Sequence, residues 1–472
     1  MKKSIFTLLI LVLSISSFSQ SNCNCEQALN QLIERVESDY PGFAEKTTYK
    51  LIYSNFKEGL RIKSQSIEES DCLDLLRTYL EYFKDGHINL TRTNVEEVGQ
   101  AEEMVSKAYA KVEISIEDFY KHISNSSDKL EGVWTSGSYK VGLLKSDNEY
   151  QGFIIEAGNK SWKANEIKFR LMGDGKANYY MSDHSMQEDN FEVFDGSILS
   201  FNDLSSVFLK ELPKPTLTEN EIQMKLNEIE GFYFKKLSEK TVLLRMSSFE
   251  QSYVERIENL IDENIELIEN CENLIIDVRD NHGGTDNAYE KLLPYLCTNN
   301  LRSVGKEFLA TQTLIDGYQK WLDITPDEEK YMKDRIFVKR CIKLFKANLG
   351  GFVNTDTTNT YITEVEIAEH SPEQIIILAN KMSASSGEAF VFLMKQSKKV
   401  KILGTPTYGA LDYASAYYFK FGCDNYQLLL PSWRASRLPD YPIDNIGVQP
   451  DIYMDQYVED WIQFALDYVE NK

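Results

Sequence analysis

Basic residues and histidine are both scarce in this chain of 472 residues. Lys and Arg number 51 against 73 Asp and Glu, which gives a formal net charge of −22. A field of that sign repels phosphate backbones and anionic lipid headgroups, so it argues against nucleic acid as a partner. The chain also contains only five histidines, which limits the choice of a histidine general base to a few positions.

Long apolar runs are missing as well, apart from one at the N-terminus. Residues 1–20, MKKSIFTLLILVLSISSFSQ, combine two lysines, an apolar stretch and small or polar residues before Ser21, which is typical of a secretory signal peptide. The apolar stretch is shorter than the roughly 20 residues that a membrane-spanning helix needs, and no later segment comes closer. We therefore expect a periplasmic or secreted protein without a membrane span. A lipid anchor at Cys23 is the alternative, but the residues before it lack the small apolar residues of bacterial lipoproteins.

Cysteine is sparse, and its spacing fits no metal site. All seven cysteines lie beyond the expected cleavage point, in a compartment where disulfides persist. Either Cys23 or Cys25 is expected to pair with Cys72. Cys271 and Cys297 flank apolar runs and are expected to be buried thiols. The C-x-C pair has neither the spacing nor the His and Cys partners of a zinc site, so we expect no metal and no cofactor.

No internal repeat or low-complexity segment interrupts the chain, and its patterns predict three folded parts after the leader. Residues 21–128 have apolar residues three and four apart, which predicts a helical domain. Residues 129–212 have short alternating stretches separated by Gly, Asp and Asn turns, which predicts an antiparallel, barrel-like β domain. Residues 213–472 alternate strands and helices, which predicts a largely parallel sheet covered by helices.

Two strand-to-helix connections in the last part are candidate sites. LIIDVRDNHGG ends a predicted buried strand in Gly283 and Gly284, whose bare amides can approach a ligand, although a tight turn explains the same residues. SASSGEAF, residues 383–390, follows the strand IIILAN and opens a helix predicted from about Ser386 to Gln396. A serine at this bend either caps the helix or lies where free amides and the helix dipole stabilise negative charge.

A serine hydroxyl becomes a good nucleophile only when a base takes its proton. His87 lies in YFKDGHINL, between a predicted helix and a predicted strand, and His282 lies in the glycine loop itself. The other histidines occur in polar segments without a supporting pattern: His122, His184 and His370. His87 and His282 are therefore the candidate bases.

Taken together, these stretches resemble the S41 serine peptidases, which include the C-terminal processing proteases and the tricorn core. The matching segments, in the family's order, are LIIDVRDNHGG, ILANKMSASSGEAF and ILGTPTYG, and DYPGF and YFKDGH are similar to secreted Bacteroidetes members. The resemblance implies an α/β, crotonase/ClpP-like peptidase core with a helical N-terminal domain. The β domain lies where many relatives carry a PDZ domain and does not look like one. The implied function is that of a secreted or periplasmic serine endopeptidase acting on peptides or unfolded proteins.

The resemblance also implies roles for particular residues. The family's nucleophile aligns with Ser385, three residues before Glu388, which is then a structural helix residue. The family's oxyanion donors map to the amides of Ser386 and of Gly284 or Gly283.

Two branches of the family differ in their general base. One uses a lysine after a T-x-G turn like residues 407–409, but Ala410 stands in that position here, so a Ser–Lys dyad is not expected. The other branch, similar to tricorn, implies His87 as the base and Asp444, within IDNIGVQPD, as the orienting carboxylate. Asp444 replaces the family's usual Glu and is one methylene shorter. Gly86 replaces the serine that tricorn carries beside its histidine.

Two other functions are alternatives to a working peptidase. A peptide-binding protein that keeps the peptidase fold without turnover is consistent with Asp444, with the unfamiliar β domain and with His282, which either contacts substrate or competes as the base. The second alternative is an enzyme of the crotonase type, which shares the core fold and uses acyl-CoA. Export to a compartment without acyl-CoA argues against this function.

Overall fold

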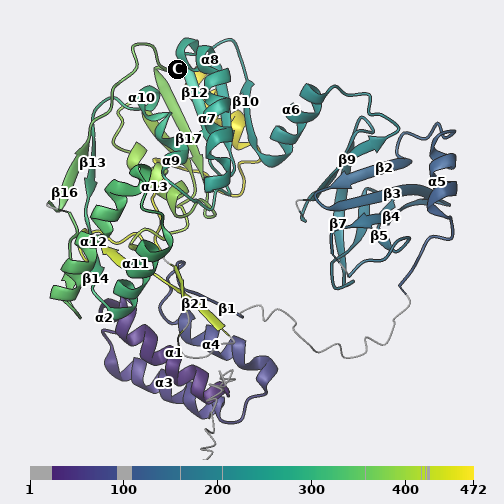
Figure 1. Cartoon of the computed structure of the whole chain (residues 1–472). Helices are drawn as coiled ribbons and strands as arrows, with labels where there is room; N and C mark the ends of the chain where they lie inside the picture. Colours follow the sequence, from purple (N-terminus) through teal and green to yellow (C-terminus); the bar gives the residue numbers. More distant parts are fainter. Residues whose placement is uncertain are drawn as a thin grey trace, which may run out of the picture. The chain divides into compact units, whose positions relative to one another are not determined.

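The computed structural model describes residues 24–92, 109–159, 161–204, 206–356, 358–415, 417–419, 421 and 426–471. The chain divides into two compact units, one made of residues 1–98 and 235–472 and the other of residues 99–234 (Figure 1). The expected signal peptide and Cys23 lie outside the described residues. The sequence patterns instead group residues 21–128 in one helical domain, whereas the first unit joins the N-terminal helices to the last part of the chain.

Helices begin the first unit. They are α1 (Cys25–Asp39), α2 (Phe43–Lys46), α3 (Lys50–Ser64) and α4 (Cys72–Glu81), with the 3₁₀ turn η1 (Glu69–Asp71) before α4. Asn24 caps α1 because its side chain accepts the Gln27 amide at 2.9 Å, while the Gln27 side chain reaches back to the Asn24 amide. The apolar faces of these helices share one core, in which Leu32, Leu76 and Phe83 are fully buried.

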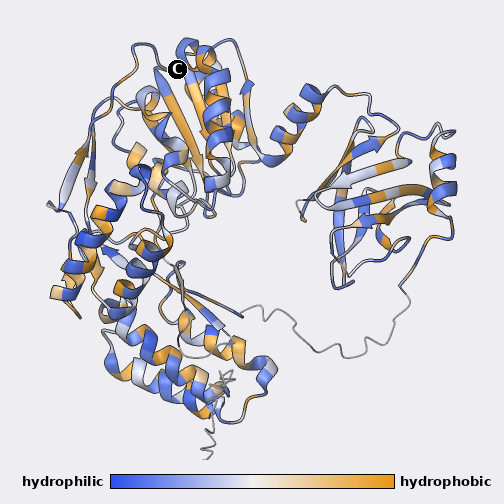
Figure 2. Ribbon diagram, in the orientation of Figure 1, coloured by the Kyte–Doolittle hydropathy of each residue, from blue (hydrophilic) through white to orange (hydrophobic). Residues whose placement is uncertain are grey.

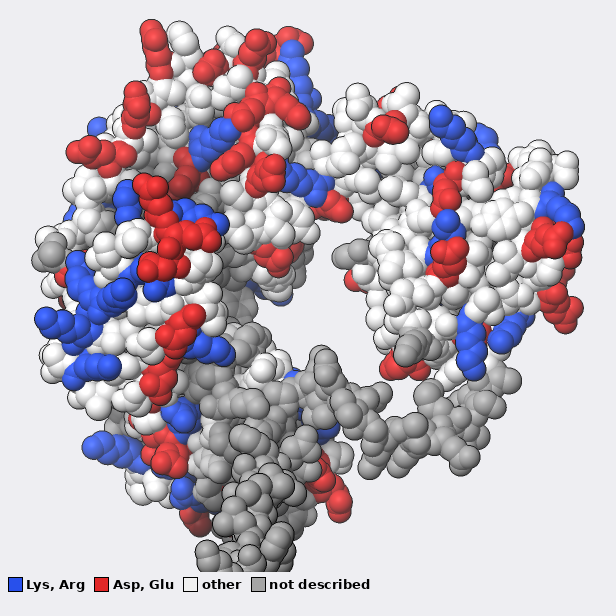
Figure 3. Space-filling model, viewed as in Figure 1, with Lys and Arg blue, Asp and Glu red and all other residues white. Residues whose placement is uncertain are grey.

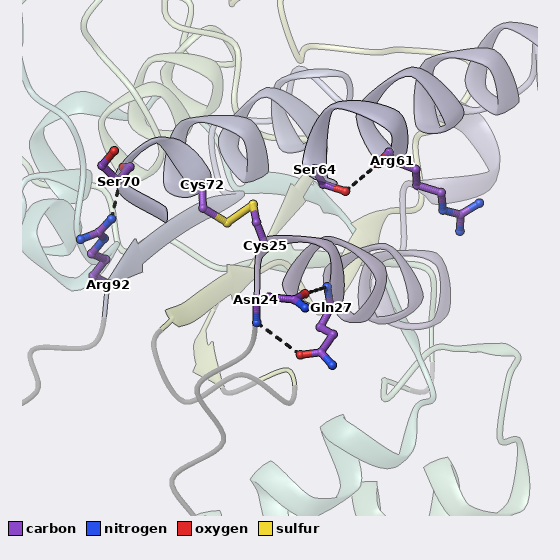
Figure 4. The surroundings of a disulfide bond; sticks show 8 residues. All are labelled: Asn24, Cys25, Gln27, Arg61, Ser64, Ser70, Cys72 and Arg92. Atoms are coloured by element: carbon purple, nitrogen blue, oxygen red, sulfur yellow. Dashed lines mark hydrogen bonds between the residues drawn. A yellow bond between two sulfur atoms is a disulfide. The ribbon is translucent and has the colours of Figure 1, made fainter. Parts of the chain in front are cut away.

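A disulfide joins Cys25, at the start of α1, to Cys72, at the start of α4 (Figure 4). The sequence left Cys23 and Cys25 as alternative partners of Cys72, and the structure selects Cys25. The unpaired cysteines of the described ranges are buried thiols, as predicted for the first two of them: Cys271, Cys297 and Cys341.

Strand β1 (Asn89–Arg92) follows these helices and pairs antiparallel with β21 (Tyr426–Leu430), which pairs in turn with β20 (Tyr417–Phe419). Leu90 of β1 lies opposite Leu428 of β21, and both side chains are fully buried. This long-range pairing holds the N-terminal helices in the same unit as the end of the chain, which local apolar spacing does not reveal.

A sheet in the order β10–β11–β12–β17–β18–β23 lies at the core of the last part of the chain (Figure 1). Its strands are β10 (Phe232–Lys236), β11 (Thr241–Met246), β12 (Asn273–Asp277), β17 (Gln374–Ala379), β18 (Val400–Gly404) and β23 (Ile452–Tyr453). All pairings from β11 to β23 are parallel, which confirms the predicted α/β class. Strands β12 and β17 are apolar along most of their length (Figure 2), because helices cover both faces of a parallel sheet.

Helices connect the strands of this sheet. They are α7 (Val254–Glu263), preceded by the 3₁₀ turn η2 (Gln251–Tyr253), α8 (Ile265–Asn270), α9 (Asn287–Glu290), α10 (Leu293–Leu296), α13 (Ser386–Met394) and, after β23, α14 (Trp461–Glu470). In α7, Ile257, Leu260 and Ile261 are buried at helical spacing, which explains why this strongly acidic segment folds as an amphipathic helix. The helix predicted from about Ser386 is α13.

Smaller sheets and a helical hairpin also belong to the first unit. Strand β13 (Leu301–Val304) pairs with β16 (Thr360–Thr363), and a second sheet has the order β15–β14–β22–β19. The remaining elements are β14 (Lys306–Leu309), β15 (Phe352–Val353), β19 (Tyr413–Ala414), β22 (Trp433–Ala435), α11 (Gln312–Ile324), η3 (Glu329–Tyr331) and α12 (Met332–Ala347). Helices α11 and α12 form the hairpin. A separate apolar core joins them to β14 and contains Phe308, Leu314 and Phe345.

The second unit contains a closed barrel, which confirms the predicted antiparallel, barrel-like middle domain. Its antiparallel strands are β2 (Gly132–Ser136), β3 (Tyr139–Ser146), β4 (Glu149–Ala157), β5 (Ile167–Met172), β6 (Lys176–Tyr180), β7 (Met186–Phe194), β8 (Ile198–Phe201) and β9 (Ser206–Leu212). Trp134, Phe169 and Phe201 fill its interior. Helix α5 (Ile116–Ile123) precedes the barrel and α6 (Glu219–Glu230) follows it.

None of the helices in the described part of the chain is both long and apolar enough to cross a membrane. Figure 3 shows acidic side chains across the viewed face, with basic side chains interspersed among them. This face fits the excess of acidic residues in the composition.

Candidate active site

The two candidate loops follow neighbouring strands of the central sheet. Strands β12 and β17 pair in parallel, with Asp277 opposite Leu378, so the glycine loop and the serine bend leave the same edge of the sheet. The buried Asp277 carboxylate accepts the Arg279 amide at 3.0 Å and forms ion pairs with Arg279 and Arg245. These contacts fix the start of the glycine loop.

Asn281 joins the two loops from a fully buried position. Its side chain accepts the Gly283 amide at 2.9 Å and donates to the Met246 carbonyl at 3.1 Å. Its own carbonyl accepts the Ala384 amide at 2.9 Å. Asn281 is not among the residues predicted from the sequence, although an asparagine shortly before a glycine pair is typical of a side-chain-stabilised turn.

Ser385 occupies the bend between β17 and α13 with φ 51° and ψ −123°. A positive φ is uncommon for a residue with a β-carbon, and strained residues of this kind cluster at functional sites. Gly283 makes room for the bend, since a β-carbon added to Gly283 would lie 2.7 Å from Ser385 Cβ and 2.6 Å from the Ala384 carbonyl oxygen. The Ser385 side chain makes no capping hydrogen bond to α13, so helix capping does not explain this serine.

The two neighbouring serines have other surroundings. Ser383 Oγ donates to the Val278 carbonyl at 2.8 Å and accepts the Asn380 amide at 3.1 Å, so Ser383 stabilises the bend. Ser386 begins α13 and is buried, and its Oγ has no hydrogen-bond partner within the described ranges.

Two backbone amides next to the serine bend have no hydrogen-bond partner among the residues that the structure describes: those of Ser386 and Gly284. The Ser386 amide is the first of α13, where unpaired N–H groups and the helix dipole favour negative charge. The Gly283 amide donates to the Asn281 side chain. Of the two glycines, Gly284 therefore has the free amide.

Glu388, in the first turn of α13, binds the loop after β18. Its carboxylate accepts hydrogen bonds from the Thr407 hydroxyl, from the Gly409 amide at 2.8 Å and from the Ala410 amide at 2.7 Å. Burial raises the pKa of this carboxyl group. Glu388 thus connects α13 to the 407–410 loop, in which Ala410 carries only a methyl group and its amide is bonded to Glu388.

His87 lies between α4 and β1, on a loop that packs against the segment after β18. A β-carbon added to Gly86 would lie 2.6 Å from the Tyr408 ring, so the two loops are in direct contact. The Tyr408 amide donates to the Ser383 carbonyl at 2.9 Å. The His87 loop, Tyr408 and the serine bend are therefore joined by a continuous set of contacts.

Asp444 lies before β23 and is 7% exposed. Its Oδ1 accepts the amides of Leu411 and Asp412 at 2.9 and 2.8 Å. Burial, followed by the nearby charges of Asp85 and Asp412, raises the pKa of Asp444 to about 8. Asp444 is thus close to Asp85 in the His87 loop, although more than 300 residues separate them in the sequence.

No hydrogen bond joins Ser385, His87 and Asp444 in this structure. His87 Nδ1 and Asp444 Oδ2 are both buried, and neither has a hydrogen-bond partner within the described residues. Catalytic hydrogen bonds are often long in a free enzyme and shorten when substrate binds. The three residues therefore belong to one unit of the protein, but no hydrogen bond joins them in the free protein.

Asp85 is a second carboxylate beside His87, and it is not among the residues predicted from the sequence. Its Oδ1 accepts the His87 amide at 2.8 Å and lies 3.9 Å from His87 Nδ1. Its Oδ2 accepts the Tyr40 hydroxyl at 2.8 Å. The signal in the sequence is the order Asp-Gly-His, because an aspartate commonly accepts the amide two residues further on.

A cavity of about 590 Å³ lies beside the His87 loop, between α4, β1 and the segments that carry Tyr408 and Asn445. Asn445 borders it and donates to the Lys84 carbonyl at 2.7 Å.

His282 is exposed on the glycine loop. Within the described ranges, no group of three or more His, Cys, Asp or Glu side chains could hold a metal ion.

Residues 240–454 match the model of peptidase family S41, a range that includes the glycine loop, Ser385 and Asp444 and begins after His87. No curated protein matches the sequence. Among solved structures, mature CPAF is similar at 14% identity and a TM-score of 0.48, over 91% of this chain and 92% of that chain. The photosystem II D1 C-terminal processing protease is similar at 12% identity and a TM-score of 0.36, over 92% and 94% of the two chains. The tricorn protease is similar at 12% identity and a TM-score of 0.40, over 94% of this chain and 36% of that chain.

Proposed function

This chain belongs to peptidase family S41 through its residues 240–454, and we propose that it is a serine endopeptidase that forms an acyl-enzyme on Ser385. The proposal rests on the geometry at Ser385: a positive φ, a side chain that does not cap α13, and unpartnered amides beside it. A strained serine at a strand-to-helix bend presents its hydroxyl for attack on a carbonyl carbon. Peptides or unfolded proteins are the proposed substrates. The leader at residues 1–20 supports a periplasmic or secreted location.

In the proposed reaction, His87 takes the proton of the Ser385 hydroxyl while Oγ attacks the scissile carbonyl carbon. The carbonyl oxygen becomes an oxyanion, and the amides of Ser386 and Gly284 stabilise its charge. His87 then gives the proton to the leaving amine as the C–N bond breaks, and the acyl group remains on Ser385. Water, with His87 again as the base, releases the second product.

Asp444 is proposed to orient the His87 ring through a hydrogen bond. The buried, unpartnered atoms His87 Nδ1 and Asp444 Oδ2 support this pairing, because a buried polar atom without a partner is costly.

Covalent labelling by a fluorophosphonate probe tests Ser385 directly. We expect the wild-type protein to be labelled and Ser385→Ala to remain unlabelled, since the probe reacts with an activated serine oxygen. Ser383→Ala is the comparison variant: its hydroxyl only stabilises the bend, so we expect labelling to persist at a reduced rate. Removal of Ser385 or His87 should also lower kcat for peptide cleavage by roughly three or more orders of magnitude. Equal labelling of Ser385→Ala and the wild type would exclude Ser385 as the nucleophile.

Peptide binding without turnover is the second candidate function. The absence of hydrogen bonds among Ser385, His87 and Asp444 favours it. A protein of this kind would bind peptides, but it would show neither probe labelling nor cleavage of a peptide pool. Labelling that depends on Ser385 excludes it.

A further inference from the structure

We propose that Asp85 is a positioning residue for His87, which holds the backbone of the base and keeps a buried negative charge beside its ring. This inference rests on the proposed peptidase function, in which His87 is the base. Asp85 itself touches neither substrate nor the reacting atoms in the proposed reaction. It acts only through His87.

The backbone hold comes from a tight turn around His87. Asp85 Oδ1 accepts the His87 amide at 2.8 Å, and the Asp85 carbonyl accepts the Ile88 amide at 3.1 Å. Gly86, between them, lies against the Tyr408 ring, which a β-carbon added to Gly86 would approach to 2.6 Å. The main chain of the base is therefore fixed by hydrogen bonds on one side and by an aromatic ring on the other.

The Asp85 carboxylate is itself locked in place. Its side chain is fully buried, and Oδ2 accepts the Tyr40 hydroxyl at 2.8 Å. The Tyr40 ring packs against Phe83 and Tyr413, with centroid distances of 5.4 Å in each case. Because neither Asp85 nor Tyr40 has room to rotate away, Oδ1 stays 3.9 Å from His87 Nδ1.

The groups around Asp85 determine whether its carboxyl group, which lies beside His87, is ionised. The titratable groups that act on it are Tyr40, Lys46, His87, Tyr413 and Asp444. Burial raises the pKa of Asp85, and burial together with the Asp85 charge raises that of Asp444. The hydrogen bonds from the His87 amide and from the Tyr40 hydroxyl act in the opposite direction and favour the ionised form of Asp85.

Asp85→Asn removes the charge and keeps the hydrogen bond to the main chain, because the carboxamide oxygen can still accept the His87 amide. Its NH2 group then faces the Tyr40 hydroxyl, whose oxygen can accept a hydrogen bond from it. We expect kcat to fall by about 10- to 100-fold, typical of an outer-shell partner, with KM within about twofold. The acidic limb of the kcat/KM profile should move to lower pH, since a negative charge beside imidazole favours its protonated form. Asp85→Ala removes the backbone hold as well and should lower kcat further.

Glu37→Gln is the matched control. Glu37 accepts hydrogen bonds from the Tyr53 hydroxyl at 2.9 Å and from Lys57 Nζ, and neither of these partners is Asp85, His87 or Tyr40. The same change from carboxylate to carboxamide should therefore leave kcat and its pH profile unchanged.

A second variant decides the question if Asp85→Asn does not fold. Tyr40→Phe keeps the carboxylate but removes the hydrogen bond that holds Oδ2. We expect kcat to fall by about tenfold with KM unchanged, because Asp85 is no longer fixed.

The outcomes separate the two levels of the proposal. A wild-type protein that neither cleaves peptides nor takes the probe overturns the peptidase function. An active wild type whose Asp85→Asn variant keeps its kcat overturns the role of Asp85 and leaves the peptidase function standing. A lowered kcat with an unmoved pH profile also overturns it, since that result indicates a purely structural residue.

Discussion

Single residues of the candidate site are held in conformations or charge states that isolated amino acids disfavour. Ser385 has a positive φ, and Asp444 is a buried carboxyl group with one unpartnered oxygen. Strain and burial of this kind persist only where neighbouring contacts enforce them. Asn281 does so for the Ser385 bend, and the Leu411 and Asp412 amides do so for Asp444.

Asp444 should make the stability of the protein depend on pH. Its pKa is raised from 3.8 to about 8 in the folded protein, so between these values the unfolded chain loses the proton while the folded protein keeps it. Its contribution to stability is therefore full below about pH 4 and is lost as the pH rises to about 8. The free energy of unfolding of the wild type should therefore fall, relative to that of Asp444→Asn, by about 1.4 kcal/mol per pH unit. Between pH 5 and pH 8 this difference should reach up to about 4 kcal/mol in favour of the variant.

Thermal unfolding of both proteins at pH 5 and pH 8 measures this difference. Asp451→Asn is a useful comparison, because hydrogen bonds and ion pairing with Lys395 lower the pKa of Asp451. Asp451 is therefore ionised at both pH values, and the effect of Asp451→Asn on Tm should be the same at pH 5 and pH 8. A difference in Tm between Asp444→Asn and the wild type that is the same at both pH values contradicts the prediction.

At the scale of elements, His87 is placed by segments on both sides of its loop. Helix α4 ends just before the loop, and β1 begins just after it. The first is tied to α1 by the Cys25–Cys72 disulfide, and the second is tied to β21 by strand pairing. The position of the base therefore depends on elements that are far from Ser385 in the sequence.

The disulfide should contribute measurably to stability. It joins residues 47 apart in the sequence, so it restricts the unfolded chain over a long loop. Replacing both Cys25 and Cys72 by serine should lower the free energy of unfolding by about 2 to 4 kcal/mol, measured by urea unfolding without reductant. Adding reductant should destabilise the wild type to the level of the variant and leave the variant unchanged. Equal stability of the two proteins without reductant would argue against a structural disulfide.

At the scale of the whole molecule, every residue of the candidate site lies in the first unit, and the barrel lies in the second. The barrel has its own apolar core, filled by residues such as Trp134, Phe169 and Phe208. Closure of the sheet also leaves no open strand edge. The second unit therefore has the properties of an independently folding domain.

Residues 99–234 expressed alone should fold. We expect a cooperative thermal transition and a near-ultraviolet circular dichroism signal from the packed aromatic residues. Trp134→Ala in the same fragment should lower its stability by about 3 to 5 kcal/mol, since Trp134 is fully buried. A fragment without a cooperative transition would show that the barrel needs the rest of the chain.

The sequence by itself determined the local structure. Apolar spacing predicted the helices, the parallel sheet and the barrel, because periodicity reports which side of each segment is buried. Motifs narrowed the candidate nucleophile to Ser385 and the candidate base to His87 by resemblance. The residue types at Asp85 and Asn281 also indicate turns. Many aspartates and asparagines form turns without any role in a site, however, so the sequence alone could not identify these two as part of the site.

Only the tertiary structure decided which distant groups meet. It selected Cys25 over Cys23 for the disulfide, left the Gly284 amide free while Asn281 took that of Gly283, and brought Asp85 close to Asp444. These outcomes depend on contacts between segments up to hundreds of residues apart, and local periodicity carries no information about such contacts. Burial and charge state likewise arise only when the chain is packed, which is why Asp444 titrates unlike an ordinary aspartate.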